Sequence, residues 1–308
     1  MKKIVTLLFS ALFLFLLPAS VLRAQQDPQY GMYFFNQLVI NPAYAGSLDQ
    51  GSLTLVGRKQ WLGMNGSPAT ASLGFHAPIG RTLHGAGLTV TQDKIGATNR
   101  FTANGVFAYR LQAGPGQLAF GLQLQGSYYS ANLNSIQHED GTDPAFNGTN
   151  ISRFLPNAGI GAFYNTKNFY AGVSLPKLVN NKLYDKTATN SAHDYRHLYI
   201  TTGVVVKVSE DVKLKPSILL KFSAPGIWAW DLNCSALFKE RVWAGISYRH
   251  KDALVGIFQY ALSYSLKFGY AYEFPISSLI NNSSGGHELM LGWEFAAGKK
   301  GLLSPRYF

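Results

Sequence analysis

The sequence predicts an all-β fold, an antiparallel transmembrane outer-membrane β-barrel of about 14 strands. Three observations predict this fold. The chain begins with an export leader, its body alternates apolar and polar residues with a period of two, and many alternating segments are 9 to 13 residues long. A strand of a soluble protein is typically about 5–6 residues long, whereas a tilted strand that crosses a bilayer needs about 9–11.

Residues 1–24 are predicted to be a signal peptide, with cleavage after Ala24. Lys2 and Lys3 precede an uncharged run over 4–17, and small residues around Ala19 follow it. This is the order of a secretory leader, and the run is too short to span a bilayer as a helix. We therefore expect the mature chain to be exported through the inner membrane.

Residues 25–50 differ from the rest of the chain because they are rich in aromatic residues and Asn and show no clean two-residue period. Asn41 followed by Pro42 favours a turn or the start of a short helix. So apolar a segment is not expected to hang free in the periplasm. It is predicted to be a periplasmic or plug segment, which fills the barrel or meets a partner, with a first strand and a turn as the alternative.

The barrel is predicted over residues 51–298, and residues 299–308 are expected to form a periplasmic tail. The two-residue template places strands near 52–59, 68–77, 84–92, 98–111, 117–130, 154–165, 168–175, 196–208, 211–223, 227–239, 241–250, 253–261, 264–274 and 287–297. The long connections are the first, fifth, seventh and thirteenth, near 60–67, 131–153, 176–195 and 275–286. Since all are odd-numbered, they lie on one side, and the N-terminus, the short turns and the tail are expected in the periplasm.

A secreted all-β sandwich is the competing fold, in which the apolar face of each sheet points to a core. In a membrane barrel the polar face lines a lumen instead. The polar face here carries side chains that a lumen could hydrate or pair, namely Arg100, Asn104, Arg110, Gln123, Gln125, Lys213, Lys215, Lys221, Arg249 and Glu294. Aromatic residues near strand ends suit interfacial girdles, namely Tyr128, Tyr129, Tyr170, Tyr199, Trp228, Trp230, Tyr260, Tyr264 and Tyr272.

The charge of the chain restricts the kinds of partner that we expect, and its cysteine content restricts the disulfide bonds that it can form. Charged residues make up 14% of the chain, against about 25% in a typical soluble domain. The formal net charge is +11, or 11 − 3 = +8 without Lys2, Lys3 and Arg23 of the leader. Because the basic residues are spread out, we expect no nucleic-acid partner, and an anionic membrane surface or acidic partner fits better. Cys234 is the only cysteine, which leaves no disulfide framework.

No enzyme, cofactor or metal site is predicted. No serine stands in a G-x-S-x-G context. His193 and His197 are four apart, but they lie in a loop that runs into a strand, with no obvious third ligand. Residues 138–143 resemble a fragment of a calcium loop without its order or distal Glu, so calcium binding by the outer loops stays open. His287 and Glu288 are adjacent on a strand, so they point to opposite faces and cannot act together.

Three stretches of the chain carry a family resemblance. The first, residues 30–46, ends in Asn-Pro-Ala-Tyr-Ala-Gly. The second is Arg-Lys-Gln-Trp-Leu-Gly over 58–63, followed by Gly66, Pro68, Thr70 and Pro-Ile-Gly over 78–80. The third, residues 283–291, is a serine-glycine loop leading into His-Glu-Leu-Met-Leu. In this order and spacing, across residues 25–297, they resemble the PorP/SprF outer-membrane proteins of the type IX secretion system of Bacteroidetes. The charged extension at 299–301 departs from that pattern.

The resemblance implies a barrel that serves protein export to the cell surface. Its expected partners are a secreted surface protein or adhesin, including those used in gliding, a periplasmic peptidoglycan-associated lipoprotein with other type IX components, and outer-membrane lipid. It places candidate partner-binding residues in the first two stretches, namely Tyr30, Asn36, Asn41, Pro42, Tyr44, Gly46, Arg58, Gln60, Trp61, Gly63 and Pro68. A passive porin or solute channel is the alternative function, and a surface enzyme acting on lipid is a further rival.

Overall fold

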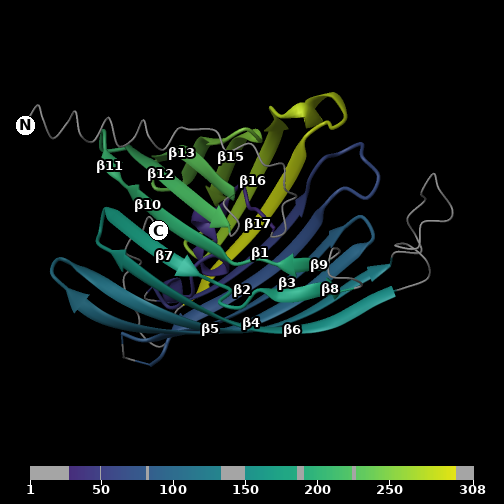
Figure 1. Cartoon of the computed structure of the whole chain (residues 1–308). Helices are drawn as coiled ribbons and strands as arrows, with labels where there is room; N and C mark the ends of the chain where they lie inside the picture. Colours follow the sequence, from purple (N-terminus) through teal and green to yellow (C-terminus); the bar gives the residue numbers. More distant parts are fainter. Residues whose placement is uncertain are drawn as a thin grey trace, which may run out of the picture.

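The computed structural model is a closed barrel of antiparallel strands around a central segment (Figure 1). It describes residues 28–48, 50–80, 83–132, 150–185, 191–223 and 227–295. The predicted signal peptide, 1–24, and the predicted tail, 299–308, lie outside these residues. Within the described ranges, no helix has the length and apolar character needed to cross a membrane.

Fourteen strands form the barrel wall: β1 (Gly51–Lys59), β2 (Ala69–Pro78), β3 (Gly85–Ile95), β4 (Thr98–Ala113), β5 (Gly116–Asn132), β6 (Asn150–Asn165), β7 (Phe169–Leu175), β10 (His197–Val204), β12 (Val212–Ser223), β13 (Ile227–Phe238), β14 (Val242–Arg249), β15 (Ala253–Ala261), β16 (Leu266–Pro275) and β17 (Gly286–Phe295). Each strand pairs with its neighbours in chain order, and β1 pairs with β17. Closure leaves no sheet edge in lipid, where unpaired backbone groups are costly. The predicted barrel and its strand count are confirmed.

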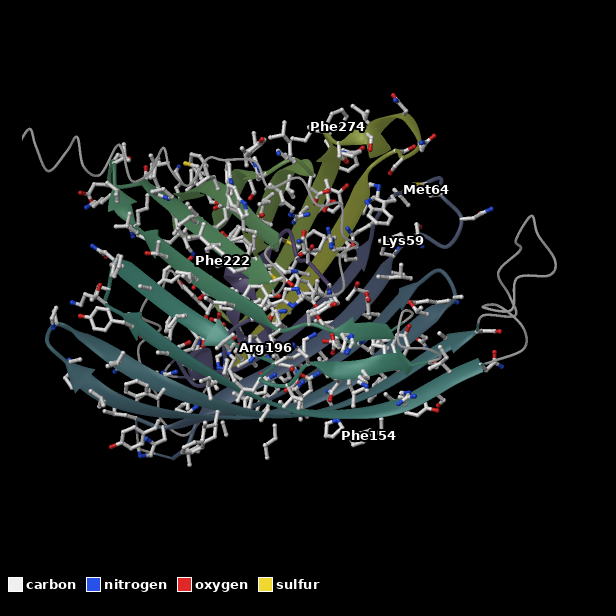
Figure 2. All side chains as sticks on the ribbon, in the orientation of Figure 1. Lys59, Met64, Phe154, Arg196, Phe222 and Phe274 are labelled. Atoms are coloured by element: carbon white, nitrogen blue, oxygen red, sulfur yellow. The ribbon has the colours of Figure 1, made fainter. Side chains whose placement is uncertain are left out.

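The two-residue period separates a lipid face from a lumen face. On β5, Phe120, Leu122 and Leu124 are 49%, 61% and 74% exposed, while Gly121 and Gln123 between them are buried. Phe154 on β6 points away from the barrel in the same way (Figure 2). Buried charged side chains face inward, so the sandwich alternative is wrong. Strand parity also corrects the aromatic girdle, because Tyr170 and Tyr199 are buried on the lumen side.

The connections differ at the two ends of the barrel. Those over 60–68, 133–149, 176–196 and 276–285 are long and share one end, whereas 114–115, 166–168 and 239–241 are short and lie at the other. We call these the long-connection end and the short-turn end. In outer-membrane barrels the longer loops face the cell exterior. The third long connection contains an unpredicted hairpin, β8 (Asn181–Asp185) with β9 (Ser191–Asp194), whose strands are too short to give a clear period.

Residues 28–48, which we call the plug segment, lie inside the lumen. They form three short 3-10 turns, η1 (Tyr33–Phe35), η2 (Gln37–Val39) and η3 (Pro42–Tyr44). The last turn begins where the sequence indicated, since the Asn41 side chain accepts the Ala43 amide at 2.9 Å and Pro42 opens the turn. The plug segment therefore has helical turns in place of the strand that was the alternative prediction.

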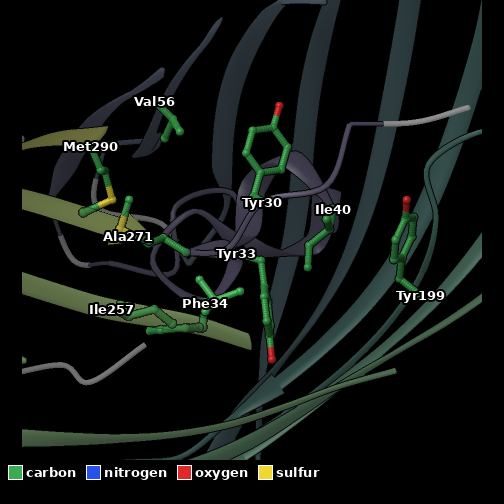
Figure 3. Packing of buried hydrophobic residues seen from close by; sticks show 11 residues of the cluster. Tyr30, Tyr33, Phe34, Ile40, Val56, Tyr199, Ile257, Ala271 and Met290 are labelled. Atoms are coloured by element: carbon green, nitrogen blue, oxygen red, sulfur yellow. The ribbon is translucent and has the colours of Figure 1, made fainter. Parts of the chain in front are cut away.

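The hydrophobic core lies between the plug segment and the wall. Tyr30, Tyr33 and Phe34 pack with wall residues such as Ile257 and Met290 (Figure 3). A second cluster joins Leu38, Ala43 and Tyr44 to other wall residues, among them Val106 and Phe163. This apolar part of the inner wall is covered by the chain's own N-terminal region, which explains why so apolar a segment precedes the first strand.

Candidate functional site: a lumen plug held by three convergent stretches

The stretches at 30–46 and 283–291 meet in the long-connection half of the lumen. The Glu288 carboxylate accepts the backbone amides of Gly31 and Met32 at 2.7 and 3.0 Å. Arg58, from the second stretch, lies 3.5 Å from Glu288, pairs with Glu273 and donates to the Gln29 carbonyl. These groups are buried, so each bond to a charge is strong and its loss costly.

The second and third stretches also meet outside the lumen, between two long connections. Leu62 donates its amide to the Gly285 carbonyl at 2.9 Å, and Ser284 donates back to the Leu62 carbonyl at 2.9 Å. Gln60 and Pro68 close the base of the 60–68 connection with a 3.0 Å backbone bond. Residues more than 200 positions apart in sequence thus form one surface above the Glu288 contact.

We call the contacts of Arg58 and Glu288 with the plug segment the plug latch. A buried charge network supports it. Arg249 contacts Asp231, Asp252 and Glu273 at 3.2 Å each. Its side chain is 2% exposed, and a buried charge requires such pairing. Sequence reasoning placed Arg249 on the lumen face but missed the acidic partners. Alternation assigns a face to each residue, but only the pairing of β13 with β14, and of both β14 and β16 with β15, brings these side chains together.

A second anchor holds the plug segment nearer the short-turn end. The buried Arg110 guanidinium donates to the carbonyls of Tyr44, Ala45 and Gly46, at 3.2 Å for Tyr44. The Gly46 amide in turn donates to His76 Nδ1 at 3.0 Å. Between the anchors, Ser174 donates to the Ile40 carbonyl at 2.5 Å, and Asn41 Nδ2 donates to the Ala162 carbonyl at 3.0 Å. The wall therefore recognises the plug segment largely through its backbone.

Glycines let the plug segment approach the wall. A Cβ on Gly121 would meet the backbone of Pro42 and Ala43, whereas a Cβ on Gly105 would meet nothing within 4 Å. Gly121→Ala is expected to destabilise the barrel by about 1–3 kcal/mol, because backbone cannot yield as a flexible side chain can. Gly105→Ala is the matched control and is expected to unfold like the parent. Heat-dependent migration on gels measures both, and equal transitions would contradict the packing.

The predicted partner-binding residues divide by location. Those of the first stretch lie buried in the lumen, namely Tyr30, Asn36, Asn41, Pro42, Tyr44 and Gly46. Arg58, Gln60 and Pro68 are also buried, Trp61 is half-buried and Gly63 is exposed. Partner binding by these residues stays a prediction. A partner could reach Trp61 and Gly63 directly, whereas the others contact their own chain.

The plug segment leaves a recess on each side. The recess toward the long-connection end is bordered by Pro28, Tyr30, Arg100 and His197, among others. The recess on the other side is bordered by Asn36, Ser52, His76 and Glu294, among others. Pro28 therefore lies in the long-connection half of the lumen, whereas the sequence predicts the N-terminus at the periplasmic, short-turn end. Gly46 lies near the short turns, beside Ala77 and Gly85.

This placement predicts the side from which residue 28 can be reached. In a Cys234→Ser background, Pro28→Cys is expected to react with a membrane-impermeant maleimide added to intact cells, because Pro28 is half-buried in the half of the lumen nearer the long connections, and longer loops face the cell exterior in outer-membrane barrels. Lys167→Cys, in an exposed short turn, is the matched control and should react only after the outer membrane is permeabilised. Labelling of residue 28 only after permeabilisation would reverse the orientation.

The profile of the type IX secretion system membrane protein PorP/SprF family matches residues 22–293. The chain belongs to this family. The match includes the plug segment and every barrel strand except the last residues of β17, so the three stretches of this PorP/SprF barrel converge within the matched region. None of the curated proteins matches the chain.

Solved structures similar to this PorP/SprF barrel are outer-membrane proteins. The CymD monoaromatic hydrocarbon channel aligns with a TM-score of 0.53 at 12% identity, over 86% of this chain and 94% of that chain. Omp33 of Acinetobacter baumannii gives 0.48 at 9% identity, covering 80% and 98%. A FadL homologue of Pseudomonas aeruginosa gives 0.47 at 13%, covering 83% and 92%. The CymD likeness supports the fold alone, and the protein is an outer-membrane β-barrel.

Proposed function

We propose that this PorP/SprF barrel binds large secreted surface proteins or adhesins at the outer membrane, supports their export or surface anchoring, and couples to periplasmic components of the type IX system. Family membership supports a role in the type IX secretion system. The single observation that carries the binding role is the plug segment, which fills the middle of the lumen and is anchored at both ends by Glu288 and Arg110.

The filled lumen argues against the passive channel. An open channel of this size needs a continuous aqueous path, and a path here would have to pass residues such as Met32, Tyr33 and Phe34, each 1% exposed. Burying these side chains against Ile257 and Met290 stabilises the closed state. We therefore favour a barrel that offers surfaces at its two mouths over one that conducts solutes.

The long-connection end is the proposed surface for the secreted partner. The 60–68 and 276–285 connections are joined by the Leu62 bonds and rest on the Arg58 and Glu288 latch. Trp61 and Gly63 have positive φ angles of 48° and 92°, so this connection has a defined shape that Gly63 adopts at little cost. A shaped loop on a rigid scaffold is a common basis for recognition.

The short-turn end is the proposed surface for periplasmic components. Charges of both signs gather there, including the exposed Lys207 with Glu210 at 2.5 Å and the half-buried Lys213 with Glu240. The hydrogen bond from Lys207 lowers the pKa of Glu210 below its usual range, so this carboxylate stays ionised to a lower pH than an ordinary glutamate does. Such alternating charges contribute more to the orientation in which a partner binds than to the affinity of binding.

We also propose that the barrel acts without catalysis. The carboxylate at the centre of the convergent stretches, Glu288, is held by Arg58 and two backbone amides. A general base needs access to a substrate proton, and this group is 3% exposed.

Site-specific photocrosslinking tests the proposal. A photoreactive residue replaces Asn65, which is exposed in the 60–68 connection, or Glu210 in a short turn. Asn65 is expected to capture a large secreted protein and Glu210 a periplasmic component, each identified by mass spectrometry. A photoreactive residue at lipid-facing Leu124 is the control and should capture neither. If a deletion strain still exports all its surface proteins and neither position captures protein, the proposal is wrong.

A further inference from the structure

Exposed charge is distributed unequally between the two ends of the barrel. Among the described residues, every exposed acidic side chain lies at the short-turn end, namely Glu210, Asp211 and Glu240. The exposed basic side chains at the long-connection end are Lys59, Lys94, Arg153, Lys182, Arg196 and Lys251. The described part of this outer rim therefore presents positive charge without exposed negative charge beside it.

Two of these lysines share one row on the lipid-facing side of the wall. Lys59 ends β1 and pairs across the sheet with Ala69 of β2, which pairs with Lys94 of β3. Strands in a sheet are about 4.8 Å apart, so the two lysines flank a small residue at a spacing of about 10 Å. Lys59 lies beside the connection that carries Met64 (Figure 2), and its Nζ donates to the Ser67 carbonyl at 2.8 Å.

The wall below this row is formed by small residues beneath Lys59 and Ala69 and by Gln92 beneath Lys94, and it is apolar further down. In the next lipid-facing row toward the short-turn end, Gly57 pairs with Ala71, and a Cβ on Gly57 would meet nothing within 4 Å. In the row after that, Leu55 pairs with Leu73, and these side chains are 47% and 39% exposed. Cationic groups at the rim, small residues below them and exposed leucines further down match the order of an anionic lipid headgroup and its acyl chains.

We propose that Lys59 and Lys94 bind the phosphate of a lipid headgroup in the outer leaflet, with the acyl chains lying over Gly57, Ala71, Leu55 and Leu73. The lysines supply charge and donors that phosphate accepts. The small residues let the lipid approach the wall, and the leucines contact its hydrocarbon. This lipid site is independent of the proposed export function, because none of its residues belongs to the plug latch.

Titration of the purified barrel in phosphatidylcholine nanodiscs with monophosphoryl lipid A tests the site. Each lysine near an anionic lipid is worth about fivefold in binding, so Lys59→Gln with Lys94→Gln is expected to weaken lipid binding by about 25-fold. Gln keeps a donor for the Ser67 carbonyl, which protects the fold. Lys59→Arg with Lys94→Arg is expected to retain binding. Lys167→Gln with Arg241→Gln, exposed at the short-turn end, is the charge-matched control and should bind like the parent.

Three outcomes would overturn the proposal. Equal loss in the short-turn control would mean that net charge alone attracts the lipid. Equal binding of dephosphorylated lipid A would remove the phosphate from the recognition. Inorganic phosphate alone binding as tightly as the lipid would make this an anion site without a lipid contribution. Unchanged heat-dependent gel migration of each variant ensures that the comparison is between folded barrels.

Discussion

Removal of residues 28–46 is expected to turn a poorly conducting barrel into an open pore. The deletion takes out all three 3-10 turns and both anchored ends of the plug segment, while the strand pairings of the wall remain. A barrel of 14 strands is wider than the eight-stranded barrel that side chains alone can fill, so single-channel conductance should rise by at least about tenfold. Planar-bilayer recordings of the purified parent and deletion proteins measure the change.

The deletion needs a control for folding, because it also uncovers Ile257 and Met290 in the lumen. Glu288→Ala is expected to open the lumen less completely than the deletion does. It leaves the wall complete but frees the Gly31 and Met32 amides and removes one partner of Arg58. Intermittent conductance is expected from this variant. If both variants keep the gel mobility of a folded barrel and neither conducts more than the parent, the plug segment is not what closes the lumen.

Arg110→Ala is expected to release the other end of the plug segment. It removes charged hydrogen bonds to the carbonyls of Tyr44, Ala45 and Gly46 and leaves these acceptors buried. Hydrogen bonds to charged groups contribute about 1.5–3 kcal/mol each, so docking of this part of the segment should weaken by at least about 3 kcal/mol. Hydrogen exchange at residues 43–47, followed by mass spectrometry, reports the loss directly.

Two variants separate this effect from a simple change in charge. Arg110→Lys keeps the charge but not the planar fork, so an intermediate loss of protection is expected. Arg241→Ala removes an exposed arginine at the short-turn end, where substitutions usually change stability by less than about 0.5 kcal/mol. Equal exchange in Arg110→Ala and Arg241→Ala would show that the carbonyl contacts do not hold the segment.

The alternation of residue types accounts for most of the wall. Side chains on a strand alternate faces, so the sequence of β5 alone separates lipid-facing Leu122 and Leu124 from buried Gln123. The same rule puts His287 outside and Glu288 inside. It cannot assign an aromatic residue to a girdle, because Tyr suits both an interface and a packed core. For this reason the pattern predicts girdle positions for Tyr170 and Tyr199, although both side chains face the lumen.

The sequence alone determined the membrane-crossing strand lengths, the end at which the long connections gather and the family resemblance, because these depend on local order and period. It also predicts an export leader, which lies outside the described residues. Only the tertiary structure decided that residues 28–48 fill the lumen and that Glu288, Arg58 and Gly31 meet there. Those contacts join residues separated by up to 257 positions. They depend on barrel closure between β1 and β17, and no local pattern specifies which distant side chains closure brings together.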